Sequence, residues 1–243
     1  GVDGTNAQIG LNTSDWTRVY IGDVTGSGID ITGNNATVKN VYIGVKPNST
    51  ASTGANVGIF VTGEPDNVVI GGPNGFDRNV ISNSTNHGIH LDGGKNGAIL
   101  GNYIGTNVTG TAEWGNGGDG IHINNIGGPG QVNTGIGVNS LGTVYAPNVI
   151  SGNKGNGIAF ESDTNFITIA SNKIGLNQSG NSAIGNDGDG INVQGNPNDV
   201  VIGGDVTQKR NLISGNGGDG IELNSVDGVV VIGNYIGYAT DGA

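Results

Sequence analysis

The residues best suited to chemistry include two histidines in matching positions. His90 and His122 each follow the glycine of a Gly-Ile pair by two residues, and Asp92 and Asn124 lie two residues further on. Glu161 occurs one repeat later. On stacked strands, these side chains would share one patch that suits a metal site or a general acid–base pair. The alternative is a solvated polar face on which two of the three histidines align.

A second set of candidates is a group of aspartates in glycine-rich turns. Asp119, Asp189 and Asp219 directly precede a Gly-Ile pair, and Asp187 adds a carboxylate to one of these turns. Short Asp/Asn/Gly loops can hold Ca²⁺ through oxygen ligands, and residues 176–190 form the best candidate loop. Asp-Gly and Asn-Gly are also common turn pairs. The nine-residue period of glycine-rich calcium repeats is absent, so the pattern favours turns, with Ca²⁺ as the alternative.

Composition and charge exclude several classes of partner. The net charge of −11 disfavours nucleic acid and anionic lipid, which need a basic surface, and it permits cations. No cysteine is present to form a disulfide or a thiolate site. The longest aliphatic run, Val229–Ile232, is too short to insert into a membrane as a helix. The sequence opens at Gly1, as expected of a chain that is processed or cut from a longer one.

An internal repeat determines where all these residues lie. A Gly-Ile pair recurs every 30 to 37 residues and begins at seven glycines: Gly28, Gly58, Gly88, Gly120, Gly157, Gly190 and Gly220. Two residues after each isoleucine stands another apolar residue, and positions two apart in a strand share a face. Each repeat therefore directs two apolar side chains inward. The residues between them point outward: Asp30, Phe60, His90, His122, Ala159, Asn192 and Glu222.

A second inward column consists of isoleucine alone. Its members are Ile43, Ile81, Ile104, Ile150, Ile174, Ile213 and Ile236. Two residues before each, except the first, stands an asparagine: Asn79, Asn102, Asn148, Asn172, Asn211 and Asn234. Identical asparagines at one turn of every repeat predict a ladder of side-chain amides that satisfy one another's hydrogen bonds.

Repeats of about 30 residues with three short strands and no helix predict one all-β domain, a right-handed parallel β-helix of about seven to eight rungs. A rung is one turn of the chain with its three strands. The domain spans residues 1–243. Residues 1–27 are expected to form an incomplete first rung and 28–237 the regular rungs. Residues 238–243 are expected to begin a loop, which would continue in a longer chain or a neighbouring subunit.

Several strings carry a specific resemblance: NVISGN (148–153), GNYIGT (101–106), NGGDGI (116–121 and 216–221) and GTAEWGN (110–116). They resemble the β-helix repeats of bacterial cell-surface and secreted proteins, in the pectate-lyase-like superfamily. The resemblance covers nearly the whole chain. It implies an extracellular or cell-surface protein, but the superfamily includes lyases, epimerases, adhesins and inert stalks.

The resemblance to pectate lyases would imply aspartates that bind calcium and an arginine that acts as base. Arg78 and Arg210 each directly precede the asparagine of an NVIS or NLIS string, so they occupy repeat positions. We find no carboxylate cluster beside either of them in the repeat register. Enzymatic activity therefore stays open, and the sequence leans against it. No cofactor is required.

Two functions are compatible with these patterns. No amphipathic cap is evident at either end of the solenoid, so a second copy, or further repeats of the same chain, is expected to stack on it. The first-choice function is thus an extracellular structural or adhesive solenoid, either a fibre subunit or a stalk. The alternative is a carbohydrate-binding or carbohydrate-active protein, lyase-like or epimerase-like, that acts on an acidic polysaccharide. Tyr42, Tyr103, Tyr235 and Trp114 would supply aromatic surfaces for sugar rings.

Overall fold

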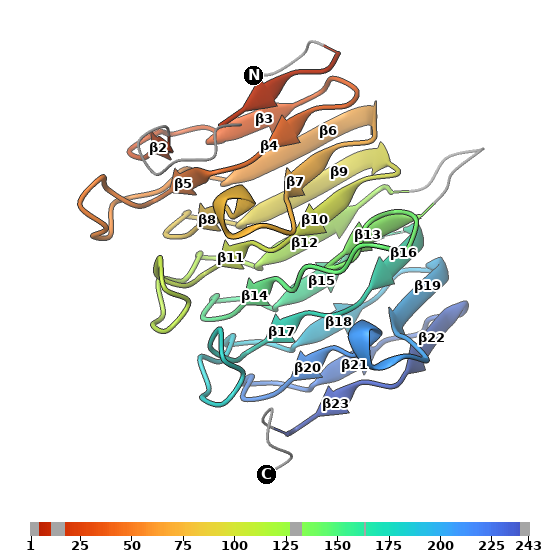
Figure 1. Cartoon of the computed structure of the whole chain (residues 1–243). Coiled ribbons are helices and arrows are strands. Elements are labelled where there is room, and N and C mark those ends of the chain that lie inside the picture. The colour runs from red at the N-terminus through yellow and green to blue at the C-terminus, as the bar shows by residue number, and fades with distance from the viewer. Residues whose placement is uncertain (1–4, 11–17, 127–132, 163, 239–243) are drawn as a thin grey trace.

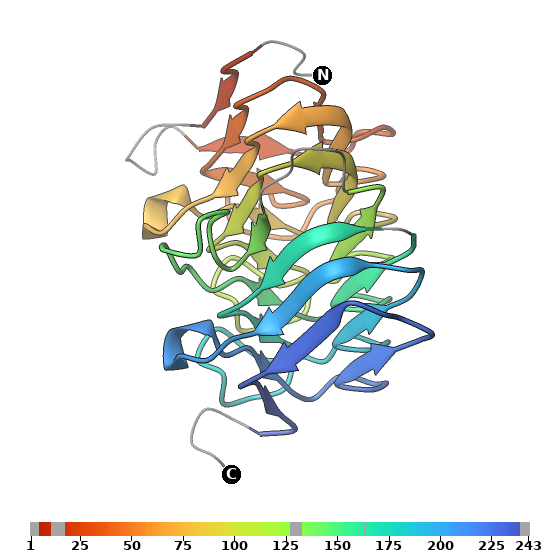
Figure 2. The same ribbon diagram turned by 90° about the vertical axis from the view of Figure 1, so that its right-hand side faces the viewer.

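The chain winds three parallel β-sheets around a single core. The computed structural model describes residues 5–10, 18–126, 133–162 and 164–238. Each turn of the chain contributes one short strand to each sheet, and successive turns stack on one another (Figure 1). Figure 2 shows the same stack from the side. The fold is a right-handed parallel β-helix, which confirms the predicted class and the three-stranded rung.

Each strand pairs with the third strand before and after it. Among the described residues, sheet A contains β3 (Ile29–Ile31), β6 (Ile59–Asp66), β9 (Ile89–Lys95), β12 (Ile121–Asn124), β15 (Ile158–Phe160), β18 (Ile191–Val193) and β21 (Ile221–Leu223). Sheet B contains β1 (Gln8–Ile9), β4 (Thr37–Val38), β7 (Val69–Gly71), β10 (Ala98–Leu100), β13 (Thr134–Ile136), β16 (Asn165–Ile169), β19 (Asn198–Gly203) and β22 (Val229–Ile232). Sheet C contains β2 (Val19–Ile21), β5 (Val41–Ile43), β8 (Val80–Ile81), β11 (Tyr103–Ile104), β14 (Val149–Ile150), β17 (Lys173–Ile174), β20 (Leu212–Ile213) and β23 (Tyr235–Ile236).

Helical structure is limited in the described residues to short 3₁₀ segments. These are η2 (Gly75–Asp77) and η3 (Thr207–Lys209), which both lie between a sheet B strand and a sheet C strand. No helix in this part of the chain is long and apolar enough to cross a membrane. Of the residues expected to begin a further loop, only Tyr238 lies within the described residues.

The predicted apolar columns fill the space between the sheets. Ile89, Ile121 and Ile158 pair in register across β9, β12 and β15. The isoleucines of the stricter column pair in the same way across sheet C, and those from Ile43 to Ile213 are fully buried. Because strands stack in this register, the outward residues also align, which places His90 directly beside His122.

The glycine of each Gly-Ile pair allows adjacent rungs to approach closely. A Cβ atom on Gly157 would lie 2.5 Å from the carbonyl oxygen of Gly190 and 2.6 Å from Cγ2 of Ile174. Both distances are well below normal van der Waals contact. At this position the repeat therefore needs glycine because of packing.

The predicted asparagine ladder lies at the turn between sheets B and C. Nδ2 of Asn102 donates to Oδ1 of Asn148 at 3.1 Å, and Asn148 donates to Asn172 at 2.9 Å. The same bond joins each neighbouring pair in the predicted series from Asn79 to Asn234. The other Nδ2 hydrogen reaches a backbone carbonyl, as from Asn148 to Ile99 at 2.9 Å. The buried amides are thus satisfied by their neighbours, and the ladder is confirmed.

A second asparagine ladder, which the sequence analysis did not predict, lies at the turn between sheets C and A. Its members are linked by Nδ2–Oδ1 bonds of 2.8 Å and are Asn116, Asn153, Asn186 and Asn216. Each stands four residues before the glycine of a Gly-Ile pair. Two ladders at different turns hold successive rungs in register on both sides of sheet C.

The outer face of sheet C is partly covered. Tyr42, Val80, Tyr103 and Val149 form a small external apolar cluster, and Trp114 packs against it. The candidate loop that begins at Leu176 is present as a hairpin closed at residues 176–183, and similar hairpins close at 45–51, 106–113 and 138–145. The loops after β5, β11 and β17 lie along the same side of the solenoid (Figure 1).

Candidate functional site

A column of polar side chains lines the turn that leads into sheet A. In four consecutive rungs, the residue before the Gly-Ile pair donates its backbone N–H to the side chain of its counterpart one rung earlier. Asp119 donates to Nδ1 of His87 at 3.0 Å, and Asn156 donates to Oδ1 of Asp119 at 2.7 Å. Asp189 and Asp219 continue the series at 2.8 and 2.7 Å. Histidine, aspartate and asparagine thus perform the same structural task, which is to accept a backbone hydrogen bond.

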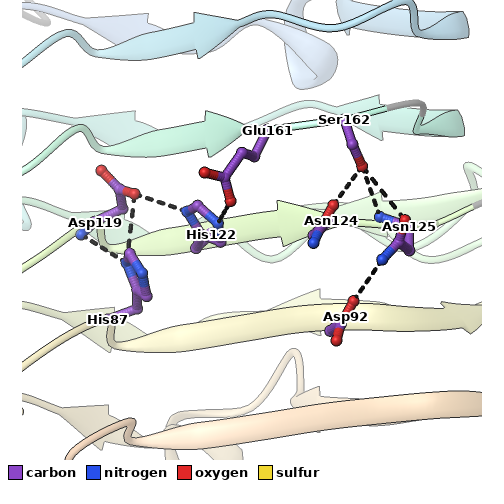
Figure 3. Close-up of polar contacts among 8 residues, drawn as sticks. All are labelled: His87, Asp92, Asp119, His122, Asn124, Asn125, Glu161 and Ser162. Carbon is purple, nitrogen blue, oxygen red and sulfur yellow. Dashed lines mark hydrogen bonds and ion pairs between the residues drawn. The ribbon is translucent and has the colours of Figure 1, made fainter.

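Asp119 is shared by two imidazole rings. Its Oδ2 atom lies 2.9 Å from Nδ1 of His122 and 3.4 Å from Nδ1 of His87 (Figure 3). The two rings stack, with centroids 4.2 Å apart and an interplanar angle of 22°. On the other side of His122, Nε2 lies 2.9 Å from Oε2 of Glu161. Side chains from three consecutive rungs therefore form one chain of contacts, which we call the histidine cluster: His87, Asp119, His122 and Glu161.

The contacts of His122 favour its charged form. Both ring nitrogens face carboxylates, which only accept hydrogen bonds, so the ring donates from both nitrogens as an imidazolium. Burial alone would lower the pKa of His122. The hydrogen bonds to Asp119 and Glu161 outweigh burial and raise this pKa above its ordinary value.

His87 has the opposite preference. Its Nδ1 accepts the backbone N–H of Asp119, which requires a neutral ring with the proton on Nε2. Burial, followed by the charge of His122, lowers the pKa of His87 to about 4. The approach of 3.4 Å to Oδ2 of Asp119 is therefore not an ion pair at neutral pH. The cluster combines one neutral and one cationic imidazole at a single carboxylate.

Asp119 remains ionised between these rings. Burial would raise the pKa of its carboxyl group. Hydrogen bonds from His122 and from the backbone N–H of Asn156, together with the nearby imidazoles, outweigh burial and lower that pKa. The side chain of Asp119 is largely buried, whereas that of Glu161 is mostly exposed. The cluster therefore reaches solvent mainly at its Glu161 end.

His90 contacts the cluster through its ring. Its centroid lies 4.8 Å from that of His122 and 5.5 Å from that of His87, edge-on in both cases. Phe60 covers it on the neighbouring strand at 4.9 Å. Nε2 of His90 is buried and has no hydrogen-bond partner among the described residues. Burial and then the charge of His122 lower the pKa of His90.

The structure brings together only part of the face that the sequence predicted. His90, His122 and Glu161 lie close to one another, as the strand register requires. Asp92 instead accepts a hydrogen bond from Nδ2 of Asn125 at 2.8 Å, further along the strands (Figure 3). Asp119 supplies the carboxylate between the rings.

His87 was not selected from the sequence, although a signal was present. It precedes a Gly-Ile pair, the same position that Asp119, Asp189 and Asp219 occupy in later repeats. The prediction treated that position only as a turn or a calcium ligand. This column lies beside the outward residues of sheet A, and the His87 ring stacks on the ring of His122 one rung later.

The predicted calcium ligands are spread along the solenoid, and the carboxylates of Asp119, Asp187 and Asp189 have protein partners. Oδ1 of Asp189 accepts the backbone N–H of Asp219, and its Oδ2 accepts Nδ2 of Asn192 at 2.7 Å. Oδ2 of Asp187 lies 3.5 Å from Nζ of Lys154. Within the described residues, the one group of three close metal-type ligands is His87, Asp119 and His122. Calcium binding at the aspartates stays a prediction.

A second set of residues repeats the geometry of the histidine cluster without imidazoles. Asn192 follows Asp189 by three residues, as His122 follows Asp119, and its Nδ2 donates to Oδ2 of Asp189. Nδ2 of Asn192 also donates to Oε2 of Glu222 on the next rung. An asparagine can therefore bridge two carboxylates at this position of the repeat, so histidine is not needed there for the fold.

The arginines have structural partners on the outside of sheet C. The guanidinium carbon of Arg78 lies 4.1 Å from the ring centroid of Tyr103, and that of Arg210 lies 4.9 Å from Tyr235. These cation–π contacts repeat between consecutive rungs. Tyr42 and Tyr103 are buried, so of the predicted aromatic column only Tyr235 is exposed to solvent.

The histidine cluster is the strongest candidate for chemistry in the described part of the chain. It can hold a metal ion through two nitrogens and one oxygen, or hold and transfer a proton through His122. Comparisons with known proteins add no assignment: no protein-family model, no curated protein and no solved structure matches the chain.

Proposed function

We propose that the protein is an extracellular structural β-solenoid that stacks end to end with further copies of itself. The observation that carries this proposal is the surface of the last described rung, formed by β21, β22 and β23. Ile213 is fully buried, whereas Ile236, its partner in the next strand, is 42% exposed. Val231 pairs with the buried Ile202 and is 41% exposed. Within the described residues, the inward columns thus end on an exposed apolar surface.

This surface also offers hydrogen-bonding groups of a defined pattern. β21, β22 and β23 are each the last strand of their sheet in the described chain, so one backbone edge of each is free for parallel pairing. The two ladders end at Asn216 and Asn234, which accept from the preceding rung. Another rung of the same design would cover the apolar columns and extend the sheets and ladders.

The sequence strings NVISGN, GNYIGT and NGGDGI support placement among bacterial surface and secreted repeats of the pectate-lyase-like superfamily. Such proteins act outside the cell, and an adhesive stalk is the closest variant of the proposed function. In that variant the covering rung belongs to the same chain rather than to a second copy. Both variants use the same rung-on-rung contact.

The experiment compares two valines of matched exposure. Val231 lies in an inward column on the open surface, whereas Val206 adjoins η3 on the outside of the solenoid and is 42% exposed. We expect Val231→Lys to abolish concentration-dependent association in sedimentation velocity, because a charge would be buried at the rung contact. Val206→Lys should associate like the unmodified protein. Equal association of both variants, or none in the unmodified chain, would contradict self-stacking.

A carbohydrate-active function is the second candidate, and one observation favours it. His122 holds a proton between two carboxylates, one of which, Glu161, is solvent-exposed. The protonated His122 can act as a general acid. The burial of Tyr42 and Tyr103, however, removes most of the expected sugar-stacking surface. Turnover of polygalacturonate that Glu161→Gln abolishes would favour the enzyme over the structural protein.

A further inference from the structure

We propose that His87, Asp119 and His122 form a binding site for one divalent transition-metal ion of the zinc class. One ligand atom of each residue lies within 4.8 Å of the others. Oδ2 of Asp119 is 2.9 and 3.4 Å from the two Nδ1 atoms. Neighbouring ligands of a tetrahedral zinc ion, bonded at roughly 2.0–2.1 Å, lie about 3.3 Å apart. Both separations between the carboxylate oxygen and a ring nitrogen therefore already lie near the required value.

The donor set selects the class of metal. Two imidazole nitrogens and one carboxylate oxygen suit zinc and its neighbours, whereas calcium prefers six or more oxygens. Three protein ligands leave one position for water or an added ligand. The side chains of His87, Asp119 and His122 are 11–16% exposed, so solvent reaches the site.

The surroundings orient each ligand. Glu161 accepts a hydrogen bond from Nε2 of His122, which leaves Nδ1 directed at Asp119. A metal-bound histidine commonly has its other nitrogen held by a carboxylate in this way. The backbone N–H of Asn156 holds Oδ1 of Asp119 and leaves Oδ2 for the ion.

Metal binding replaces two existing contacts. The ion takes the Nδ1 lone pair of His87 in place of the backbone N–H of Asp119, and it displaces the Nδ1 proton of His122. The Nδ1 atom of His87 accepts a backbone N–H, so this ring is neutral and its Nδ1 atom carries a lone pair. Binding therefore releases a proton from His122 and weakens as the pH falls. The ion would join the turns before β9 and β12 and so link two consecutive rungs.

The protein supplies its own matched controls. All three histidines of the chain lie in or beside the cluster, and no cysteine is present, so binding that depends on imidazole can arise only here. Asn156 and Asn192 show that asparagine fits the positions equivalent to His87 and His122 while keeping the hydrogen bonds. His87→Asn and His122→Asn therefore remove a ligand without removing the structural contact. Asp189→Asn is the control for Asp119→Asn, because it makes the same chemical change in the second set of residues, which contains no histidine.

The experiment is a competition for Zn²⁺ between the purified chain and a chromophoric chelator. We expect one ion per chain, and a loss of at least tenfold in affinity for His87→Asn, His122→Asn and Asp119→Asn. Glu161→Gln should cost about 10–100-fold, as is typical of a residue that orients a metal ligand. Asp189→Asn and His90→Gln should bind like the unmodified chain.

Spectroscopy of the unmodified chain gives an independent test. Co²⁺ in place of Zn²⁺ should show the intense visible bands of a four-coordinate site, and calorimetry in two buffers should detect a released proton.

The proposal is overturned if the chain binds no Zn²⁺ at micromolar concentration. It is equally overturned if affinity survives both asparagine variants, or if His90→Gln abolishes binding as strongly as they do. None of these outcomes depends on end-to-end stacking.

Discussion

Nδ2 of Asn102 lies 3.1 Å from Oδ1 of Asn148, although 46 residues separate them in the chain. This bond is one step of a buried ladder that connects six consecutive rungs. Each amide between the two ends of the ladder both accepts from one neighbour and donates to the next. The ladder therefore ties the register of every rung to that of the rungs beside it.

Removing one amide from the middle of this ladder should be costly. Asn148→Ala removes the acceptor of both the side-chain amide and the backbone N–H of Asn102, and it removes the side-chain donor to Oδ1 of Asn172. Each buried group left unsatisfied costs about 1–3 kcal/mol. We expect the urea midpoint to fall clearly. Asn181→Ala, at an exposed loop position, is the control and should leave the midpoint nearly unchanged. Equal midpoints for the two variants would mean that the ladder contributes no stability.

The close approach of rungs at the Gly-Ile pair gives a second prediction. Gly157→Ala places a methyl group 2.5 Å from a backbone oxygen, so the rungs must separate or the strand must shift. We expect destabilisation of about 1–3 kcal/mol, the usual cost of overpacking, measured by urea unfolding. Gly75→Ala is the matched control, because an added Cβ there meets nothing within 4 Å. Stability equal to that of the control would show that the core can absorb the methyl group.

The two imidazoles of the cluster should titrate far apart. In metal-free protein followed by NMR, His87 should titrate at about pH 4 and His122 above its ordinary value of 6.5. His90 should titrate below 6.5. Three overlapping titrations near pH 6.5 would contradict the hydrogen-bond assignments, because solvated rings have no reason to differ.

These shifts give stability two opposite dependences on pH. His87 binds its proton less tightly in the folded state, so stability should be lost as the pH falls from 6.5 towards about 4. His122 binds its proton more tightly when folded, so its contribution is present below pH 6.5 and is lost as the pH rises through its folded pKa. The urea midpoint should be measured as a function of pH. His87→Asn should flatten the loss of stability between pH 6.5 and about 4, and His122→Asn should flatten the loss of stability above pH 6.5. If either variant flattened the loss in the other pH range instead, the protonation state assigned to that histidine would be wrong.

The second set of residues, which contains Asp189 and Asn192 and no histidine, should accept a transplanted metal site. Asn156→His combined with Asn192→His places imidazoles around Asp189 as His87 and His122 surround Asp119. Zinc titration should then show two ions per chain instead of one. Either single change should leave one ion. A stoichiometry of one in the double variant would mean that the column geometry alone does not make a site.

The fold followed from the sequence because its rules are local and repeated. Each Gly-Ile pair, with an apolar residue two positions later, defines one strand, and its recurrence predicts the stacking of Ile89, Ile121 and Ile158. The first asparagine ladder was visible because each member stands two residues before an isoleucine of an unbroken column. The second ladder was missed because Asn116 and Asn153 lie in glycine-rich turns, where asparagine is common for other reasons.

The candidate site could be predicted only in part, because it depends on how turns from different rungs face one another. The strand register placed His90 beside His122, as expected. It could not show that the turn residue His87 would stack on His122, or that Asp119 would lie between them. Burial of Tyr42 and Tyr103 was likewise invisible, since it depends on how the neighbouring loops fold back over sheet C.

The most direct test of the proposed function is negative-stain electron microscopy of the purified chain over a range of concentrations. The exposed inward columns of β22 and β23 predict rods of constant width that lengthen by end-to-end addition as concentration rises. Val206→Lys should form the same rods, and Val231→Lys should remain as single short particles. Single short particles of the unmodified chain at every concentration would contradict the account.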